Sequence, residues 1–243
     1  MRALRTLALI SAVAVLPIAA HAQTHVYHLN GTLADQNGGP SLVSDGGLLS
    51  ASGYFFDNNK GLSLSNVFAT DQSYSLVIHS RFNGILGAVG WQKIVDFWDR
   101  TSDHGMYSYF GSADFDPYTL TVGVDYQPGV FSTTILTRDA SDLTLRIYVD
   151  GIHRYTITDG GGYSNFNPGI ARFFEDDYVT NETEFGGGLV DYIATYNTVL
   201  SDEDAVNISN GLVVTPEPST LVFLATGLFA TIGVARRRTT KRR

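Results

Sequence analysis

The chain of 243 residues contains no cysteine, and only 16% of its residues are charged. Without cysteine it can form no disulfide and has no thiol nucleophile, so its folded part depends on core burial alone. Hydrophobic residues make up 44% of the chain, which is too many for a disordered or collagen-like protein. The composition therefore indicates a globular protein of one or two domains.

Basic residues are also scarce through most of the chain. Eight of the 16 lysines and arginines lie at the two ends, so residues 23–214 carry 8 basic and 23 acidic side chains, a net charge of −15. A body this acidic is not expected to bind nucleic acid. Its charge also disfavours direct contact with an anionic polymer or lipid, unless a divalent cation bridges the two.

The N-terminus has the three parts of a secretory signal peptide over residues 1–22. Two arginines precede an apolar run, and Ala20 and Ala22 place small residues at the −3 and −1 positions of a cleavage site before Gln23. We therefore expect export across the inner membrane, with the folded body beginning at residue 23.

Residues 213–243 combine a proline-containing motif, an apolar stretch at about 220–235 and a basic tail at 236–243. The motif consists of Pro216, Glu217, Pro218 and Ser219. As a transmembrane helix the apolar stretch would be roughly 24 Å long, slightly short of a ~30 Å hydrocarbon core, and bilayer thinning can accommodate this. The basic tail should stay in the cytoplasm, so the body lies outside.

This arrangement resembles the PEP-CTERM sorting signal of Gram-negative bacteria. The resemblance implies recognition by an exosortase, an inner-membrane enzyme similar to cysteine proteases and transpeptidases, and cleavage near residues 216–219. It also implies final delivery to the cell surface or to an extracellular biofilm matrix. The alternative is a plain C-terminal membrane anchor with a proline-containing stalk, which predicts the same orientation of the body.

The body shows no long helical periodicity, and short alternating runs predict strands instead. The clearest is a hairpin over 143–157, because its central Asp150-Gly151 pair can take the positive φ angles of a type I′ turn. Further strands are expected at 54–56, 62–68, 74–82, 92–98, 106–110, 118–124, 130–137, 170–174 and 189–196. Ten or more short strands separated by glycine- and asparagine-rich turns predict an all-β, two-sheet antiparallel jelly-roll sandwich.

One short helix is expected at the end of the body. Ser201 is a suitable N-cap, and Asp204 provides an aspartate variant of the capping box. Gly211 can end the helix after about Asn210.

Residues 187–206 (GGLVDYIATYNTVLSDEDAV) resemble the last strand and short helix of laminin-G-like domains in the concanavalin A-like lectin/glucanase superfamily. The hairpin at 143–159 and the segments 92–97 and 103–107 resemble other parts of such domains. The resemblance implies that residues 23–212 form one laminin-G-like jelly roll. In that superfamily calcium and sugar sites often lie on loops.

Glucanases of this superfamily carry two catalytic carboxylates on one strand, in a pattern close to Glu-x-Asp-x-Glu. No such run occurs here, and Glu182 and Glu184 have same-face spacing without the central aspartate. We therefore expect a protein that is not an enzyme. One alternative is a secreted glycoside hydrolase or polysaccharide lyase with a degenerate motif, and another is a purely structural, membrane-tethered protein.

The first candidate site is an acidic segment at residues 175–184. Asp176 and Asp177 are candidate Ca²⁺ ligands, because Ca²⁺ takes six to eight oxygens from carboxylates and loop carbonyls. A solvated acidic loop without a metal is the alternative. His25 and His28 are near enough in sequence to share a metal, although histidines near a terminus are more often plain surface residues.

Aromatic residues provide the second candidate site. Phe174 and Tyr178 adjoin the acidic segment, and Trp91 belongs to a further set with Trp98, Tyr107, Tyr109 and Phe110. Exposed rings can stack on sugars, whereas rings on alternating strands more often fill a core. We take Phe174, Tyr178 and Trp91 as candidate ligand-binding residues. The expected partner is an extracellular polysaccharide or another surface protein.

Overall fold

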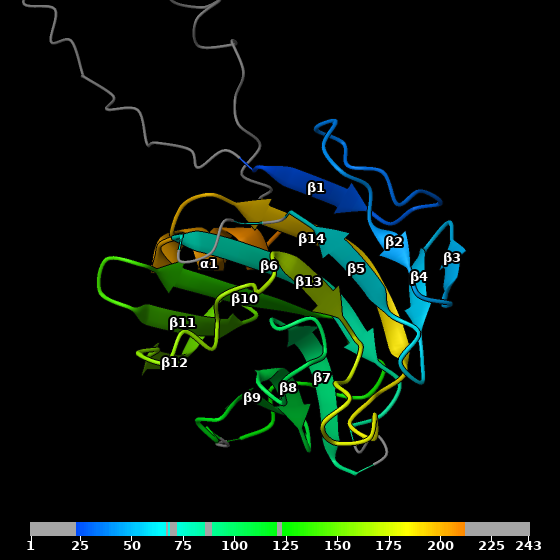
Figure 1. Cartoon of the computed structure of the whole chain (residues 1–243). Helices are drawn as coiled ribbons and strands as arrows, with labels where there is room; N and C mark the ends of the chain where they lie inside the picture. The colour runs from blue at the N-terminus through cyan, green and yellow to red at the C-terminus, as the bar shows by residue number, and fades with distance from the viewer. Residues whose placement is uncertain (1–22, 67, 69–71, 86–88, 121–122, 212–243) are drawn as a thin grey trace, which may run out of the picture.

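The computed structural model describes residues 23–66, 68, 72–85, 89–120 and 123–211, which form two antiparallel β-sheets and one short helix (Figure 1). This is the two-sheet, all-β sandwich predicted from the sequence. The predicted signal peptide with Ala20 and Ala22, the motif at 216–219, the apolar stretch and the basic tail lie outside the described residues. No helix in the described part of the chain is long and apolar enough to cross a membrane.

The larger sheet has eight strands in the order β12-β11-β10-β6-β14-β4-β3, and β1 also pairs with β14. The strands are β1 (His25–His28), β3 (Leu48–Ser50), β4 (Gly53–Phe56), β6 (Tyr74–Phe82), β10 (Ser132–Asp139), β11 (Thr144–Val149), β12 (Ile152–Thr158) and β14 (Gly188–Tyr196). Because β1 pairs with β14, the first and last strands of the described chain meet in this sheet.

The smaller sheet has six strands in the order β2-β5-β13-β7-β8-β9. These are β2 (Val43–Ser44), β5 (Leu62–Ser65), β7 (Trp91–Asp96), β8 (Gly105–Tyr109), β9 (Ser112–Asp116) and β13 (Ile170–Phe173). Since β7 is next to β13, the loop that leaves β13 toward β14 begins beside β7. That neighbourhood holds most of the candidate site residues.

The core fills the space between the two sheets. Along β6, alternate residues point inward, and Tyr74, Leu76 and Ile78 are buried there. A second, smaller apolar cluster joins the opposite face of the eight-stranded sheet to α1 (Asp202–Ser209). Its buried members are Val77, Ile135, Tyr148, Ala194, Tyr196, Leu200 and Ala205. The helix thus covers part of the outer face of this sheet.

The local signals in the sequence produce the expected turn and helix. Asp150 and Gly151 have φ angles of 51° and 75° between β11 and β12, as a type I′ turn requires. Ser201 caps α1 in a reciprocal capping box with Asp204, and Gly211 follows the helix with a φ of 76°. Both predictions are confirmed.

One predicted strand is wrong. The described residues of 118–124 form no strand, and the chain instead pairs at β9, which the sequence analysis missed. Pro117 has no N–H to donate to a ladder, and the Asp114 carboxylate accepts a hydrogen bond from the Leu120 backbone at 2.9 Å. These features turn the chain away from the sheet. The short strands β1, β2 and β3 were also missed.

We expect Ser201→Ala to lower the free energy of unfolding by ~1 kcal/mol, because the helix loses its N-cap acceptor. Chemical denaturation of the full-length protein measures this. Thr198→Ala, at an exposed position just before the helix, should leave stability unchanged. Equal stabilities for the two variants would contradict the role of the cap.

Candidate functional site

The loop between β13 and β14 is folded by its own carboxylates. Asp177 Oδ1 accepts hydrogen bonds from the backbones of Val179 and Thr180, at 2.6 and 2.9 Å. Asp176 Oδ2 accepts from Thr180 Oγ1 at 2.9 Å and from the Glu184 backbone at 2.8 Å. The two predicted calcium ligands therefore hold the loop in shape, and both are buried.

A buried lysine neutralises this loop. The Nζ atom of Lys93, on β7, lies 2.5 Å from Asp177 Oδ2, 3.4 Å from Asp96 Oδ2 and 3.7 Å from Asp176 Oδ1. Burial alone would lower the pKa of Lys93, but the charges of Asp96 and Asp177 outweigh it and raise that pKa. Burial would likewise raise the pKa of Asp177, yet Lys93 lowers it. Lys93 thus supplies a fixed positive charge where the sequence suggested a metal.

Arg100 contacts and holds the exposed side chain of Tyr178. Its side chain is 61% exposed, and the Arg100 guanidinium lies 4.2 Å from the centre of its ring. Arg100 also donates to the Asp176 carbonyl at 2.5 Å and forms an ion pair with Glu182. A buried arginine therefore holds an exposed aromatic ring in place, which reduces the entropy that a stacked ligand would have to overcome.

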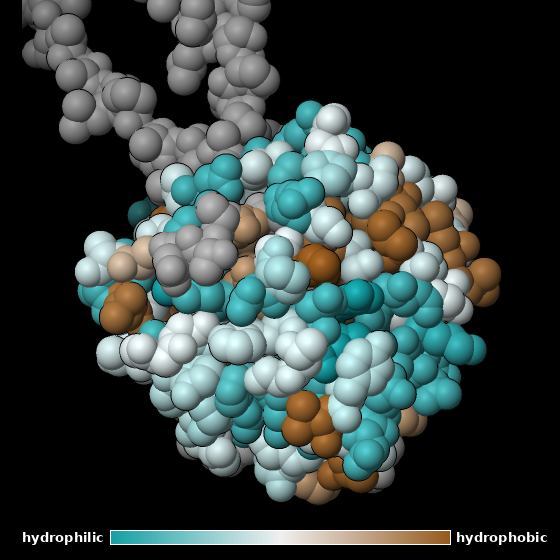
Figure 2. Space-filling view, in the orientation of Figure 1, coloured by the Kyte–Doolittle hydropathy of each residue, from teal (hydrophilic) through white to brown (hydrophobic). Residues whose placement is uncertain are grey.

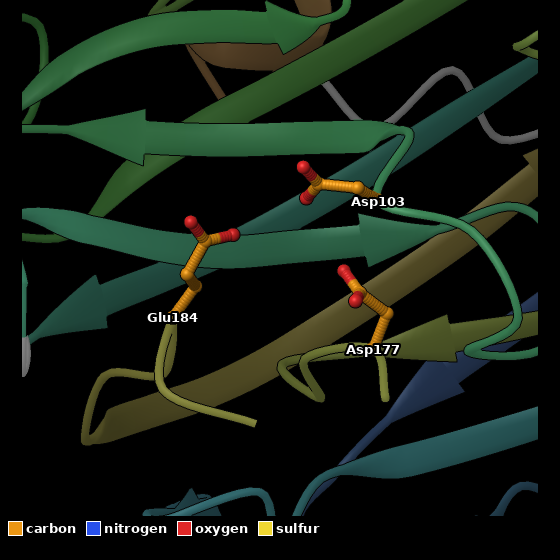
Figure 3. Close-up of side chains that lie close together, drawn as sticks. All are labelled: Asp103, Asp177 and Glu184. Atoms are coloured by element: carbon orange, nitrogen blue, oxygen red, sulfur yellow. The ribbon is translucent and has the colours of Figure 1, made fainter. Parts of the chain in front are cut away.

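Three carboxylates converge next to this loop. Ligand oxygens of Asp103, Asp177 and Glu184 all lie within 4.8 Å of one another, and Figure 3 shows the three side chains pointing toward one another. Asp103 comes from the β7–β8 loop, and Glu184 lies where its carbonyl accepts from the Lys93 backbone at 3.0 Å. Of the residues that the structure describes, these three are the ones that could hold a divalent cation. Such an ion would compete with Lys93, which already binds Asp177.

A proton is the alternative partner for this cluster. Burial raises the pKa of Glu184 to about 7, and the charges of Asp103 and Asp176 add to the rise. Burial also raises the pKa of Asp103. At neutral pH the cluster therefore exchanges a proton readily, and Glu184 carries it part of the time.

Glu175, at the start of the loop, is a second carboxyl group that keeps its proton. Burial raises its pKa to about 9, and Asp45 adds to the rise, while Arg172 and Arg100 offset it only in part. Arg172 Nη1 lies 3.3 Å from Glu175 Oε2. The acidic segment is therefore less negative in the folded protein than its sequence suggests.

Trp91 and Tyr109, which we call the aromatic shelf, lie on the outer face of the six-stranded sheet. Trp91 pairs with Tyr109, with ring centres 4.0 Å apart, and Lys93 pairs with Tyr107. Residues two apart share a face of a strand, so these four side chains all point away from the core. Tyr107 connects the shelf to the carboxylates, because its ring meets Trp91 edge-on at 5.3 Å and its hydroxyl donates to Asp103 Oδ1 at 3.0 Å.

Three sequence-based assignments need correction. Phe174 is only 2% exposed and stacks on Phe56 in the core at 3.8 Å, so we remove it from the candidate ligand-binding residues. Glu182 and Glu184 do not form a same-face pair, because Glu182 has a φ of 58° and its side chain pairs with Arg100. His28 lies three residues after His25 on a strand, so the two rings point to opposite faces and share no metal.

The structure brings Trp91, Asp176, Asp177 and Tyr178 to one region and adds residues that the sequence analysis missed. The added residues are Lys93, Arg100 and Asp103, and Tyr107 of the predicted aromatic set joins them. Lys93 had a detectable signal, since it is the one basic residue in the strand WQKIVD. No local pattern marked Asp103 or Arg100 as site residues, because the loop residues that they meet there lie more than 70 positions away in the sequence.

Comparison with known proteins confirms the sorting signal. Residues 214–238 match the PEP-CTERM protein-sorting motif. This motif implies export, membrane anchoring before exosortase processing, and a final location at the cell surface. No curated protein matches the chain in sequence.

Solved structures resemble the fold at low sequence identity. Trypanosoma rangeli sialidase aligns with a TM-score of 0.61 and 14% identity over 83% of this chain, which spans about a third (34%) of the sialidase. The ligand-binding domain of botulinum neurotoxin serotype D, in complex with N-acetylneuraminic acid, aligns with a TM-score of 0.57 and 12% identity, over 78% of this chain and 51% of that one.

A single domain of similar size also aligns. Domain 4 of AbnA, a GH43 extracellular arabinanase from Geobacillus stearothermophilus in complex with arabinotriose, has a TM-score of 0.54 and 12% identity. The alignment covers 78% of this chain and 99% of that domain. At these identities the likenesses show a shared β-sandwich fold.

We expect Lys93→Met to destabilise the protein by ~3–5 kcal/mol, because it leaves buried Asp96 and Asp177 without their cation. Adding Asp177→Asn should restore part of this loss, since asparagine keeps Oδ1 as an acceptor for the loop. Denaturant titration measures both variants, with Lys60→Met at an exposed position as the control. A loss no larger than that of Lys60→Met would show that the buried ion pair contributes nothing.

The raised pKa of Glu184 predicts a specific pH dependence. The folded protein holds this proton more tightly than the unfolded chain does. The protonated Glu184 therefore contributes its full stabilisation of the fold below pH 4.5, and this stabilisation is lost as the pH rises to about 7. Glu184→Gln should therefore raise the free energy of unfolding by ~1–2 kcal/mol at pH 8 and by much less at pH 4.5. Stability curves parallel to those of the wild type would contradict this, and Glu203→Gln on exposed α1 is the control.

Proposed function

We propose that this chain is an exported, non-catalytic surface or matrix protein whose β-sandwich binds polysaccharide. The observation that carries the proposal is the exposed Tyr178 ring, which Arg100 holds at one end of β7, while the partly exposed rings of Trp91 and Tyr109 lie at the other end. Rigid aromatic faces stack on the apolar faces of sugar rings, and neighbouring carboxylates accept hydrogen bonds from hydroxyl groups. Asp103 and Glu184 are the partly exposed carboxylates of that kind.

The sorting motif supports a location where such polymers occur. Export brings the body outside the inner membrane, and exosortase processing near residues 216–219 would release it to the surface or to an extracellular matrix. The body's net charge of −15 favours a neutral polymer, or an acidic one bridged by a divalent cation.

The face drawn in Figure 2 is better suited to binding a polysaccharide than to forming a large protein interface. On the face drawn in Figure 2, hydrophobic residues form small separate patches among polar ones. Protein interfaces usually have a contiguous apolar centre, whereas sugars need only isolated rings within a polar surface.

Glycoside hydrolysis is the second candidate, and the proton on Glu184 favours it. A carboxylic acid with a pKa of about 7 next to an ionised carboxylate is a frequent acid–base arrangement. Against this, Asp177 is fully buried and bonded to Lys93, so it cannot reach a substrate. We therefore place binding ahead of catalysis.

Affinity electrophoresis of the full-length protein tests the proposal. The panel includes neutral glucans, uronic acid polymers, arabinan and sialylated glycans. We expect retention by at least one polymer and a loss of about fivefold or more in Tyr178→Ala, since a stacked ring contributes ~1 kcal/mol. Leu48→Ala, at a position 66% exposed on β3, is the matched control.

Two outcomes would count against polysaccharide binding at this surface. The first is no retention by any polymer, which would leave a purely structural role. The second is equal retention of Tyr178→Ala and wild type. Release of reducing ends from the panel, abolished in Glu184→Gln, would instead favour the hydrolase.

A further inference from the structure

A pocket of about 180 Å³ lies on the other side of the molecule, between α1 and the outer face of the eight-stranded sheet. We call it the α1 pocket. Its lining includes the strand residues His79, Tyr192 and Tyr196 and, from α1, Ser209. The pocket therefore shares no side chain with the surface around Tyr178.

The rings that line the α1 pocket are held in fixed positions. His79 stacks on Phe131 with ring centres 4.8 Å apart, and its Nδ1 lies 2.6 Å from Asp191 Oδ1. His28 packs its ring edge against Tyr192 at 5.0 Å. Because these contacts are made within the protein itself, a ligand would find a preformed aromatic wall.

The same pocket has spare hydrogen-bonding capacity. The Gln23 amide donates to the hydroxyl oxygens of Tyr192 and Tyr196 at 2.6 and 2.9 Å, and each phenol hydrogen remains to be donated. Asp191 occupies Nδ1 of His79, so Nε2 remains. Within the described part of the chain, Ser209 Oγ is buried and has no hydrogen-bond partner. A buried hydroxyl without a partner is costly, and a polar ligand that reached it would offset that cost.

Charge limits what can occupy the α1 pocket. No aspartate, glutamate, lysine or arginine is among its lining residues in the described structure. A charged ligand would lose its hydration there without gaining a counter-ion, and the net charge of −15 further disfavours an anion. A purely apolar ligand would leave His79 Nε2 and the phenol hydrogen of Tyr192 without partners.

We propose that the α1 pocket binds one neutral sugar ring, as a free monosaccharide unit or the end of a chain. A pyranose combines an apolar face, which matches the rings of Tyr192 and His28, with several hydroxyl groups, which match the Tyr192 hydroxyl, His79 Nε2 and the Gln23 amide. The pocket volume suits one such ring and not a polymer lying across it. This inference does not rest on polysaccharide binding at Tyr178, since the two sites lie on different sheets.

Saturation-transfer NMR and calorimetry with methyl glycosides of D-glucose, D-galactose and D-mannose test this site. The full-length protein is kept in lauryldimethylamine oxide, a detergent without a sugar headgroup. We expect at least one glycoside to bind, with intermolecular contacts from its protons to the ring of Tyr192. Ser209→Leu, which fills the pocket, and Tyr192→Ala should each weaken binding at least tenfold. Val206→Ala, on the exposed side of α1, should bind like the wild type.

Three results would overturn the proposal: no binding by any of the three glycosides, unchanged binding in a folded Ser209→Leu variant, or sugar contacts to rings other than those of the α1 pocket. Melting curves establish that each variant is folded. If both pocket variants unfold, the intermolecular contacts in the wild type still show whether the sugar binds in the α1 pocket. Tyr178→Ala separates this site from the polymer surface, because an equal loss there would assign the sugar to Tyr178.

Discussion

The buried ammonium group of Lys93 is the interaction on which the candidate surface depends. It connects β7 of the six-stranded sheet to the loop after β13 through Asp177, and it also faces Asp96 and Asp176. Carboxylates cannot be buried without compensation, because the lost hydration costs several kcal/mol per ion. The loop can therefore pack on the sheet only where this cation meets it. The positions of Tyr178 and Glu184 follow from that contact.

Several different partners neutralise the negative charge of the acidic segment. Lys93 compensates Asp177, Arg100 compensates Glu182, and protons remain on Glu175 and, in part, on Glu184. Most of the negative charge that suggested a calcium site is thus neutralised within the fold. What remains is the cluster of Asp103, Asp177 and Glu184, where an ion or a proton would be in competition.

The two sheets present outer faces of different chemistry. The six-stranded sheet carries charged groups and exposed rings, held by Lys93 and Arg100. The eight-stranded sheet carries α1 and an uncharged aromatic pocket. Gly211, after which the sorting segment follows in sequence, lines that pocket, so the surface around Tyr178 lies on the other sheet from the point where the segment begins. A protein sorted through its C-terminus would keep that surface away from its attachment point.

The sequence alone determined the features that depend on neighbours along the chain. The 74–82 strand, the Asp150-Gly151 turn and the capping box of α1 follow from alternation, backbone preference and side chains three residues apart. The sorting motif was readable for the same reason, since it is a linear order of segments. These signals hold because local geometry needs no information from distant residues.

Only the tertiary structure decided which residues share a site. Phe174 and Tyr178 are both aromatic residues of one short segment, yet packing against Phe56 buries the first and Arg100 exposes the second. Lys93 meets Asp177 across 84 positions, and Asp103 meets Glu184 across a comparable interval. Such contacts depend on how strands order within a sheet. That order follows from the total burial of the core and from charge compensation, and no local pattern records it.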